Sequence, residues 1–411
     1  FFFGIRGGCG ANRPMLLAIC VAVDSWAAAP PARALLPAQH SRARALINSA
    51  ALESFTYSKE ARSNLPYAAV PTPFDADALN AEAATPATPR WKFRLAGLVF
   101  ALIKRSPLYA PIKKSAIEKM VASAESTGLD WAASVRALQD DGTCSQANVD
   151  AVVAENEPPV AIPAYFQQPF HAYDDGNLCW EHATEQSLAS AAVGARNLPG
   201  LPPEEGEEIF RGAWERELRA LLPDDCGAKT AGASIVDLGC GSGASARRLL
   251  GAFPSAASCV GLDLSPHMIV VGRSLLRRAA FSDARLRLVH GDAAATRRPS
   301  ASADLVSLCL VLHELPAAAT DEILAEANRV LKPGGHLAVF EMDPASPGFA
   351  RIRSNPWIFT VVRSTEPYLD DYFWEVAPTL QERIKSAGMS IVGKRLIETN
   401  KHQVLVAQKP A

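Results

Sequence analysis

Three glycines beside a buried carboxylate are the part of this sequence whose residue types and spacing point most directly to chemistry. Residues 234–237 (Ser-Ile-Val-Asp) have the composition of a buried strand, and Gly239, Gly241 and Gly243 follow. Residues 244–250 then have a helical pattern. An open α/β sheet uses a strand, a glycine turn and a helix to bring backbone close to a nucleotide-like ligand. The sequence therefore predicts a cofactor site at this turn.

A second carboxylate lies where such a site needs one. Asp263 ends the second predicted strand, 20 residues after Gly243. A carboxylate at the carboxyl end of that strand can accept hydrogen bonds from two ribose hydroxyls. Because no Gly-Lys-Ser/Thr sequence follows the glycines, the pattern excludes a phosphate-binding P-loop.

The glycines alone leave two cofactors open. Gly239-x-Gly241-x-x-Ala244 also satisfies the loose dinucleotide pattern of nicotinamide oxidoreductases. Asp237 distinguishes the two, since it lies inside the strand, two residues before the first glycine. An anionic pyrophosphate has no use for a carboxylate there, whereas a ligand with an ammonium group and a sulfonium does. The residues therefore favour a sulfonium cofactor over a nicotinamide.

The elements that position these residues alternate between apolar runs and helical patterns, which predicts a mostly parallel sheet. Strands are predicted at 233–238, 258–263, 285–290, 304–309, 335–342, 388–396 and 402–408. Helices are predicted at 243–252, 266–280, 319–330 and 376–387. A short turn joins the last two strands and predicts an antiparallel hairpin. The fold class is therefore α/β, a Rossmann-like seven-stranded sheet with a terminal hairpin and an N-terminal helical region.

Five motifs in this part of the chain resemble the successive motifs of class I S-adenosylmethionine-dependent methyltransferases. They occupy residues 235–243, 261–268, 290–293, 304–315 and 329–335, and they most resemble the type 11 group. The resemblance covers about residues 231–345. Residues 363–372 and 171–180 further resemble a cyanobacterial and plastid-type branch. The resemblance implies a methyltransferase (EC 2.1.1.-) that binds S-adenosylmethionine and acts on a small molecule.

The same resemblance assigns binding roles to residues along these motifs. The residues that contact the methionine part are Asp237, Gly239, Cys240, Gly241, Gly243, Cys309 and Leu310. The residues that contact the adenosine part are Asp263 at the ribose and Leu264, Asp292 and Ala293 at the adenine. For the glycines the alternative is a tight turn without a ligand, and for Asp292 it is a surface loop acid.

His313 is the predicted general base, with Glu314 beside it to orient or share that role. It follows the fourth strand at the carboxyl edge of the sheet, and histidine titrates near neutral pH. An acceptor oxygen or ring carbon must often lose a proton when it receives a methyl group. The alternative is that His313 packs at the strand–helix junction. Because cofactor motifs do not prove turnover, a non-catalytic protein with an assembly role also stays open.

Composition and the N-terminal residues bear on partners and location. The net charge of −2 gives no global basic field, so no nucleic-acid partner is expected. The eight cysteines form no Cys-x-x-Cys pair, which favours free thiols.

Residues 1–58 combine a short apolar run with an acid-poor, Arg-containing segment, as in a two-part plastid presequence. A mitochondrial or simple plastid transit peptide, or a tail with no address, is the alternative. Residues 59–90 are a Pro/Ala-rich linker, and 231–411 are the methyltransferase domain.

Residues 91–230 are a predicted helical region added before this domain. Residues 91–121 are basic and partly apolar, which fits either peripheral contact with an anionic membrane or a packed helix pair broken at Pro107 and Pro111. Residues 165–180 are rich in aromatic, acidic and histidine residues. Such a segment either lines a substrate pocket or attaches the helical region to the main domain. His171, Cys179 and His182 have no second ligand pair, so no metal is expected. Residues 356–374 are an aromatic insertion of either acceptor-binding or core type.

Overall fold

The computed structural model describes residues 90–107, 109–171, 173–197, 203–277, 282–363 and 366–411. The predicted presequence at 1–58 and nearly all of the predicted linker lie outside these residues.

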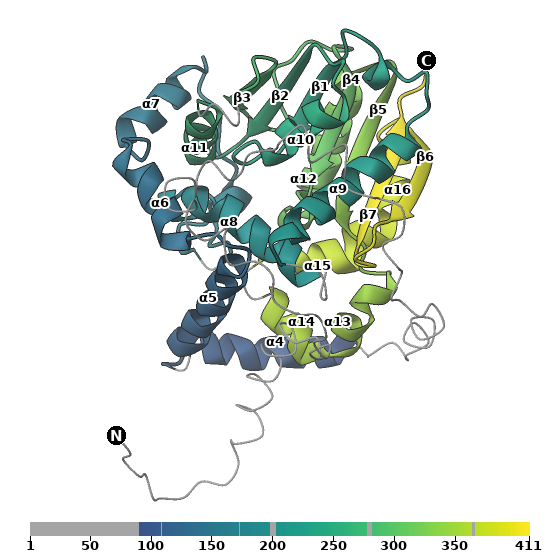
Figure 1. Ribbon diagram of the computed structural model, residues 1–411. Helices are drawn as coiled ribbons and strands as arrows, with labels where there is room; N and C mark the ends of the chain where they lie inside the picture. Colours follow the sequence, from purple (N-terminus) through teal and green to yellow (C-terminus); the bar gives the residue numbers. More distant parts are fainter. Residues whose placement is uncertain (1–89, 108, 172, 198–202, 278–281, 364–365) are drawn as a thin grey trace, which may run out of the picture.

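The centre of the molecule is one seven-stranded sheet (Figure 1). Its strands are β1 (Ser234–Leu238), β2 (Ser258–Asp263), β3 (Leu286–His290), β4 (Ala303–Cys309), β5 (Leu331–Met342), β6 (Ser390–Leu396) and β7 (His402–Gln408). Their order is β3-β2-β1-β4-β5-β7-β6. The first five strands are parallel, and β7 is antiparallel to both β5 and β6. The predicted fold, including the terminal hairpin, is confirmed.

Alternate residues of the buried strands face opposite sides of the sheet and build two cores. Ile235 and Leu305 pack with the helices α9 (Pro203–Leu221), α10 (Ala244–Ala252) and α11 (Pro266–Leu276). Val236 and Val306 pack with α12 (Ala317–Val330) and α16 (Ala377–Ser386) on the other side. The result is a three-layer α/β/α sandwich in which β1 and β4 are central. Because parallel strands end at the same edge, their carboxyl ends bring the predicted site residues together.

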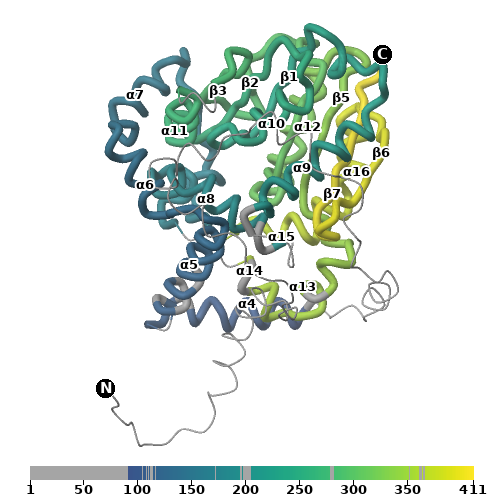
Figure 2. The backbone as a smooth tube through the Cα atoms, in the orientation of Figure 1, coloured from purple at the N-terminus to yellow at the C-terminus, as the bar shows by residue number. Residues whose placement is uncertain are grey.

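The helical region before the sheet consists of α4 (Arg90–Lys104), α5 (Tyr109–Glu125), α6 (Trp131–Asp140), α7 (Gln146–Ala154), η1 (Ala164–Gln167) and α8 (Trp180–Asn197). It is continuous with the sandwich, because Phe93 joins one core and Val149 and Val152 join the other. Figure 2 shows α4 and α5 at the end of the molecule away from β1–β3. No helix among the described residues is both long enough and apolar enough to span a bilayer.

The predicted helix pair is present, but only one of its two prolines separates the helices. The chain leaves α4 before Pro107. Pro111 instead lies in the first turn of α5. A proline is tolerated there because the first N–H groups of a helix have no intrahelical partner. Among the described residues the cysteines are free thiols, at 144, 179, 226, 240, 259 and 309.

The insertion between β5 and α16 folds as a string of short helices. These are η5 (Pro347–Phe349), α13 (Ala350–Ser354), α14 (Pro356–Val362), α15 (Leu369–Asp371) and the π-helical η7 (Tyr372–Val376). Phe359, Tyr372 and Phe373 are almost fully buried in the core under α12. The structure therefore assigns most of the insertion's aromatic residues to helix packing, one of the two interpretations of the sequence. Short segments η2 (Gly227–Lys229) and η4 (Leu312–Glu314) complete the described chain.

Candidate active site

The glycine loop adopts backbone conformations that only glycine accepts easily. Gly239, Gly241 and Gly243 have φ angles of 70°, 54° and 90°. A Cβ on Gly239 would lie 2.7 Å from Val311 Cγ2, which follows β4. Gly243 then begins α10. The loop therefore places backbone rather than side chains at the end of β1.

Asp237 lies directly under this loop and is fully buried in β1. Its Oδ2 accepts a hydrogen bond of 2.5 Å from Ser245 Oγ, and its Oδ1 has no hydrogen-bond partner among the described residues. Burial raises the pKa of Asp237 to about 6. A buried carboxylate oxygen without a partner is uncommon, and an ammonium donor or a nearby positive charge would stabilise it.

Asp263 ends β2 and links that strand to the glycine loop. Its Oδ2 accepts from the backbone N–H of Gly241, and its Oδ1 accepts from the N–H of Ser265, both at 2.8 Å. Burial raises the pKa of Asp263 to about 6. Since each carboxylate oxygen has two lone pairs, both can still accept a ribose hydroxyl. Leu264, the next residue, is buried beside it.

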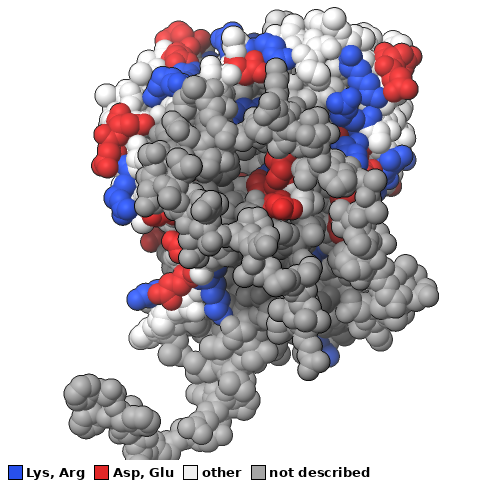
Figure 3. All heavy atoms as spheres, viewed as in Figure 1, with Lys and Arg blue, Asp and Glu red and all other residues white. Residues whose placement is uncertain are grey.

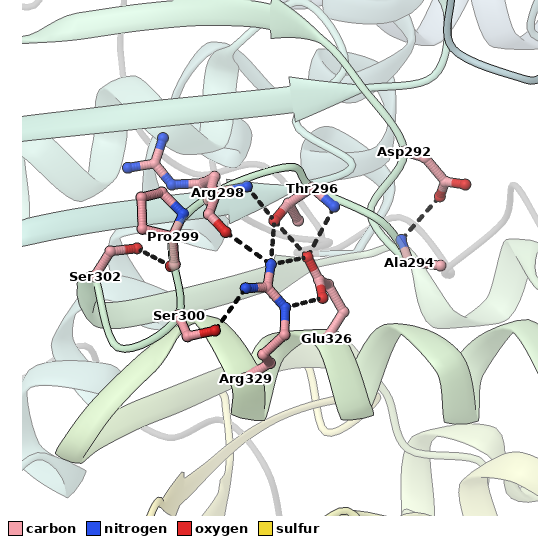
Figure 4. Close-up of polar contacts among 9 residues, drawn as sticks. All are labelled: Asp292, Ala294, Thr296, Arg298, Pro299, Ser300, Ser302, Glu326 and Arg329. Carbon is pink, nitrogen blue, oxygen red and sulfur yellow. Dashed lines mark hydrogen bonds and ion pairs between the residues drawn. The ribbon is translucent and has the colours of Figure 1, made fainter. Parts of the chain in front are cut away.

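Asp292 and Ala293 lie in the loop after β3, which α12 holds in place (Figure 4). Asp292 Oδ1 accepts from the N–H of Ala294 at 2.8 Å. Farther along the loop, Glu326 accepts from the N–H and the hydroxyl of Thr296 and pairs with Arg329. The side chain of the half-buried Asp292 is thus held by a hydrogen bond within its own turn. Its contact with the adenine of the cofactor stays a prediction.

Cys309 and Leu310 close the site at the end of β4. Leu310 has a φ of 58°, which is rare for a non-glycine residue and clusters at functional sites. Burial raises the pKa of Cys309 to about 12, so its thiol stays protonated. Arg211, on α9, donates to Cys309 Sγ at 3.1 Å and to Ser190 Oγ at 2.8 Å. The positive charge of this arginine also acts on Asp237.

Helix α8 lies over the glycine loop. Gln186 Oε1 accepts from the N–H of Ser242 at 2.9 Å and from its hydroxyl at 2.7 Å. The side-chain amide of Gln186 also packs against Gly241, where a Cβ would lie 2.0 Å from Gln186 Nε2. The helical region therefore covers the cofactor side of the sheet edge with polar side chains from α8 and α9.

His313 is held by a carboxylate that the sequence analysis did not single out. Its Nδ1 lies 2.9 Å from both carboxylate oxygens of Glu341, a fully buried residue of β5. Burial by itself lowers the pKa of His313, but the charge of Glu341 raises it to about 10. The imidazole is therefore protonated at neutral pH. A general base must be able to lose that proton, so the predicted role requires Nε2 to act at elevated pH or beside a second positive charge.

Glu314 pairs with a histidine from the helical region. His171 Nε2 lies 3.1 Å from Glu314 Oε1, and Asn177 donates to the other oxygen at 3.3 Å. Burial raises the pKa of Glu314, but His171 and its neighbours lower it to about 2. His171 has a φ of 48°, so strained backbone also occurs here. His182, 5.1 Å away between ring centres, stays neutral because burial lowers its pKa to about 3.

Glu366 completes this acid–base cluster, which we define as His171, His313, Glu314, Glu341 and Glu366. Burial raises the pKa of Glu366, and the charges of His313 and His171 act against that rise. Its Oε2 is buried with no hydrogen-bond partner among the described residues. The two predicted catalytic residues thus lie in one cluster of charges, and their roles stay predictions.

The remaining aromatic candidates lie around this cluster. Tyr368 donates to the backbone oxygen of Tyr165 at 3.2 Å, and their rings are 6.3 Å apart. Tyr173 is hydrogen-bonded to Glu185 and stacks on His182. The 165–180 segment therefore anchors the helical region at the site. No three His, Cys, Asp or Glu side chains among the described residues lie close enough to hold a metal ion.

S-adenosylmethionine fits the residues that the fold brings together. The unpartnered oxygen of Asp237 suits its cationic methionine part, Asp263 suits its ribose, and the glycine loop places backbone without side chains between them. A dinucleotide fits less well, because the buried charge of Asp237 would face an anionic pyrophosphate.

Comparisons with known proteins concern the same part of the chain. Residues 235–335 match the family described as "Methyltransferase domain". A demethylmenaquinone methyltransferase of Tropheryma whipplei (strain Twist) is 35% identical over 27% of this chain and 43% of its own length. An uncharacterized methyltransferase of Synechocystis sp. is 28% identical over 56% of this chain and 91% of its own length. An S-adenosylmethionine-dependent methyltransferase structure from Mesorhizobium loti covers 49% of this chain and all of its own, at 20% identity and a TM-score of 0.35.

Residues 235–335 thus match a methyltransferase domain, which supports the resemblance to the class I S-adenosylmethionine-dependent methyltransferases, and the cofactor that this domain implies is S-adenosylmethionine. The chain spans less than half the length of the Tropheryma protein. The cyanobacterial and plastid-type branch stays a prediction.

Sequence reasoning missed Arg211, Gln186, Glu341 and Glu366. Arg211 and Glu341 had a usable signal, since a charged residue in an otherwise apolar helix face or strand is rarely left unpaired. Gln186 and Glu366 had none, because only the tertiary arrangement brings their elements to the site.

Proposed function

We propose that this chain transfers a methyl group from S-adenosylmethionine to a small-molecule acceptor, aromatic or lipophilic, in a plastid. The observation that supports an acceptor reaction is the acid–base cluster beside the cofactor site. Such groups are costly to bury unless they are paired, and perturbed titratable groups concentrate at functional sites. The relative named for demethylmenaquinone supports an acceptor of the lipophilic ring class.

The chain's residues have separate tasks in this reaction. Bound S-adenosylmethionine supplies an electrophilic methyl group on a sulfonium. Asp237 and Arg211 would hold the methionine end of this cofactor, and Asp263, which already accepts from the N–H of Gly241, would hold its ribose. Alignment of the acceptor with that methyl group contributes several kcal/mol to lowering the barrier.

His313 would accept the proton that the acceptor loses. Glu341 fixes the Nδ1 side of the imidazole, which leaves Nε2 as the atom that faces an acceptor. The imidazolium of His313 would lose its proton more easily beside a positive charge such as that of a bound sulfonium, because like charges repel at short range. Glu314, held by His171 and Asn177, stays ionised and fixes the neighbouring wall of the site.

A transfer assay tests the proposal. The purified chain is incubated with methyl-labelled S-adenosylmethionine and with water-soluble or lipid-soluble fractions of a plastid extract. We expect label in a lipid-soluble product, and much less of it with the His313→Ala variant. No labelled small molecule in any fraction, with cofactor binding intact, would overturn the proposal and favour a non-catalytic assembly role.

Two further measurements address the alternatives. Calorimetry with S-adenosylmethionine and with a nicotinamide dinucleotide distinguishes the cofactors, and we expect heat only from the former. A fluorescent fusion to residues 1–90 tests the location, for which the mitochondrion is the alternative to the plastid.

A further inference from the structure

Helix α4 carries apolar residues on two opposite faces. One face holds Phe93, Ala96, Phe100 and Ile103, all of which are at most 7% exposed. Phe93 packs edge-on against Phe359 and Trp374, with ring centres 5.4 Å apart in both pairs. This face alone explains why α4 is bound to the insertion helices.

The opposite face of α4 is apolar and open to solvent. Trp91, Leu95, Leu98 and Leu102 follow one another at helical spacing and are 60%, 53%, 66% and 67% exposed. We name these four residues the outer stripe. They are the most exposed of the large apolar side chains among the described residues, and single scattered ones would need no explanation. A continuous stripe on one helix indicates a surface that meets an apolar partner.

The charges beside the outer stripe indicate the chemistry of that partner. Lys92, Arg94 and Arg105 are exposed, and α4 contains no acidic residue. Lys92 Nζ lies 5.8 Å from the centre of the Trp91 ring. Apolar side chains with a tryptophan and flanking basic residues match an anionic bilayer surface, where the apolar groups enter the interface and the cations meet the headgroups. Two such helices facing each other would instead bring their basic flanks together, which disfavours a second copy as the partner.

The described part of the face seen in Figure 3 does not share this charge bias. Figure 3 shows Lys and Arg interspersed with Asp and Glu on the described part of the visible face. On this face the basic character of α4 is not repeated, and the net charge of −2 does not oppose it.

The position of α4 also connects the outer stripe with the active site. A hollow between α4 and the insertion is lined by Phe100 and Ala101 on one side and by Arg363 and Glu366 on the other. Glu366 belongs to the acid–base cluster, where its charge interacts with that of His313. The hollow therefore joins the α4 side of the molecule to a residue of the acid–base cluster.

We propose that α4 docks this protein on an anionic membrane surface through the outer stripe and its basic flanks. The proposal concerns binding to lipid, so it does not depend on methyl transfer. Membrane docking would also explain why the acceptor is lipophilic, and this part of the proposal rests on the proposed function.

Vesicle sedimentation of the full chain tests this proposal, without cofactor or acceptor. We expect binding to vesicles of phosphatidylcholine with about 30% phosphatidylglycerol, and at least tenfold weaker binding to phosphatidylcholine alone. Leu95→Ser/Leu98→Ser should reduce binding at least tenfold. Lys92→Glu/Arg94→Glu should reduce it similarly and remove its dependence on salt.

A matched control uses exposed apolar residues elsewhere. Val392→Ser/Leu396→Ser changes two residues of β6 that are 39% and 38% exposed, and it should bind vesicles like the unmodified chain. Far-ultraviolet circular dichroism verifies that each variant is folded. Equal binding of the stripe and control variants would overturn the proposal, as would no binding of the unmodified chain. A dimer in sedimentation velocity that Leu95→Ser/Leu98→Ser dissociates, without vesicle binding, would assign the stripe to a second copy instead.

Discussion

At the scale of single residues, the site is governed by carboxylates that the fold buries before any ligand is present. Asp237 and Asp263 both have pKa values raised to about 6 by burial. Their raised pKa means that each binds a proton more readily than an exposed aspartate does. A ligand that brings positive charge favours the ionised form, so ligand binding and proton release are linked.

This linkage predicts how cofactor affinity depends on pH. Affinity should rise between about pH 5 and pH 7 and then level off, because below pH 6 the cofactor must displace a proton from Asp237. Calorimetry near pH 6 in buffers of different ionisation enthalpy should detect the released proton. Asp237→Asn should bind less tightly and lose most of this pH dependence, whereas an unchanged dependence would show that the proton comes from elsewhere.

Asp263 should contribute more to cofactor affinity than Asp292. Its carboxylate fixes the glycine loop through Gly241 and is placed to accept the ribose hydroxyls. Losing hydrogen bonds to a charged group costs roughly 1.5–3 kcal/mol, so Asp263→Ala should weaken binding by about 10- to 150-fold. Asp292→Ala serves as the comparison, because Asp292 mainly closes its own turn. Unchanged affinity in Asp263→Ala would contradict the ribose assignment.

The His313–Glu341 pair predicts the pH profile of turnover. If His313 is the base, kcat should rise with pH toward an apparent pKa well above 6.5, because Glu341 stabilises the protonated imidazole. Glu341→Gln keeps the shape and removes the charge, so it should move that apparent pKa downward. His313→Ala should leave cofactor affinity nearly intact and lower turnover by about 100-fold or more. A profile that Glu341→Gln does not shift would assign His313 to packing.

At the scale of elements, the loop after β3 depends on helix α12. Arg329 donates to Glu326 and to the backbone oxygen of Arg298, and Glu326 holds Thr296 (Figure 4). Arg329→Met should leave Glu326 underpartnered and lower the free energy of unfolding by about 1–3 kcal/mol. Lys114→Met breaks an ion pair of α5 whose side chains are 78% and 64% exposed, so it should change that free energy by less than about 0.5 kcal/mol. Chemical denaturation compares the two, and equal effects would contradict the anchoring role.

The sequence allowed prediction of those features that repeat along the chain. Alternation of apolar runs with helical patterns identified all seven strands, and burial on both faces makes the central parallel strands β1 and β4 uniformly apolar. The glycine turn and Asp263 were predictable because backbone conformation and strand ends constrain residue type locally. The pairing of Glu341 with His313 and the effect of Glu366 on His313 were not predictable, since these residues meet only after distant segments pack together. For the same reason the aromatic insertion could be assigned to the core only from its packing.

At the scale of the whole molecule, the helical region and the sheet share both cores and one site. Phe93 packs into the core under α12, and Gln186 on α8 is fastened to the glycine loop. With side chains of one region completing the hydrogen bonds of the other, neither part retains its interior when the other unfolds. We therefore expect residues 90–411 to unfold as one cooperative unit.

Far-ultraviolet circular dichroism and tryptophan fluorescence should give coincident transitions in denaturant, because both regions contain buried tryptophans, Trp131 and Trp214. S-adenosylmethionine should move both transitions together to higher denaturant, since its predicted site includes the glycine loop to which Gln186 of α8 is hydrogen-bonded. Two separate transitions, with only one responding to the cofactor, would show that the helical region folds independently of the sheet.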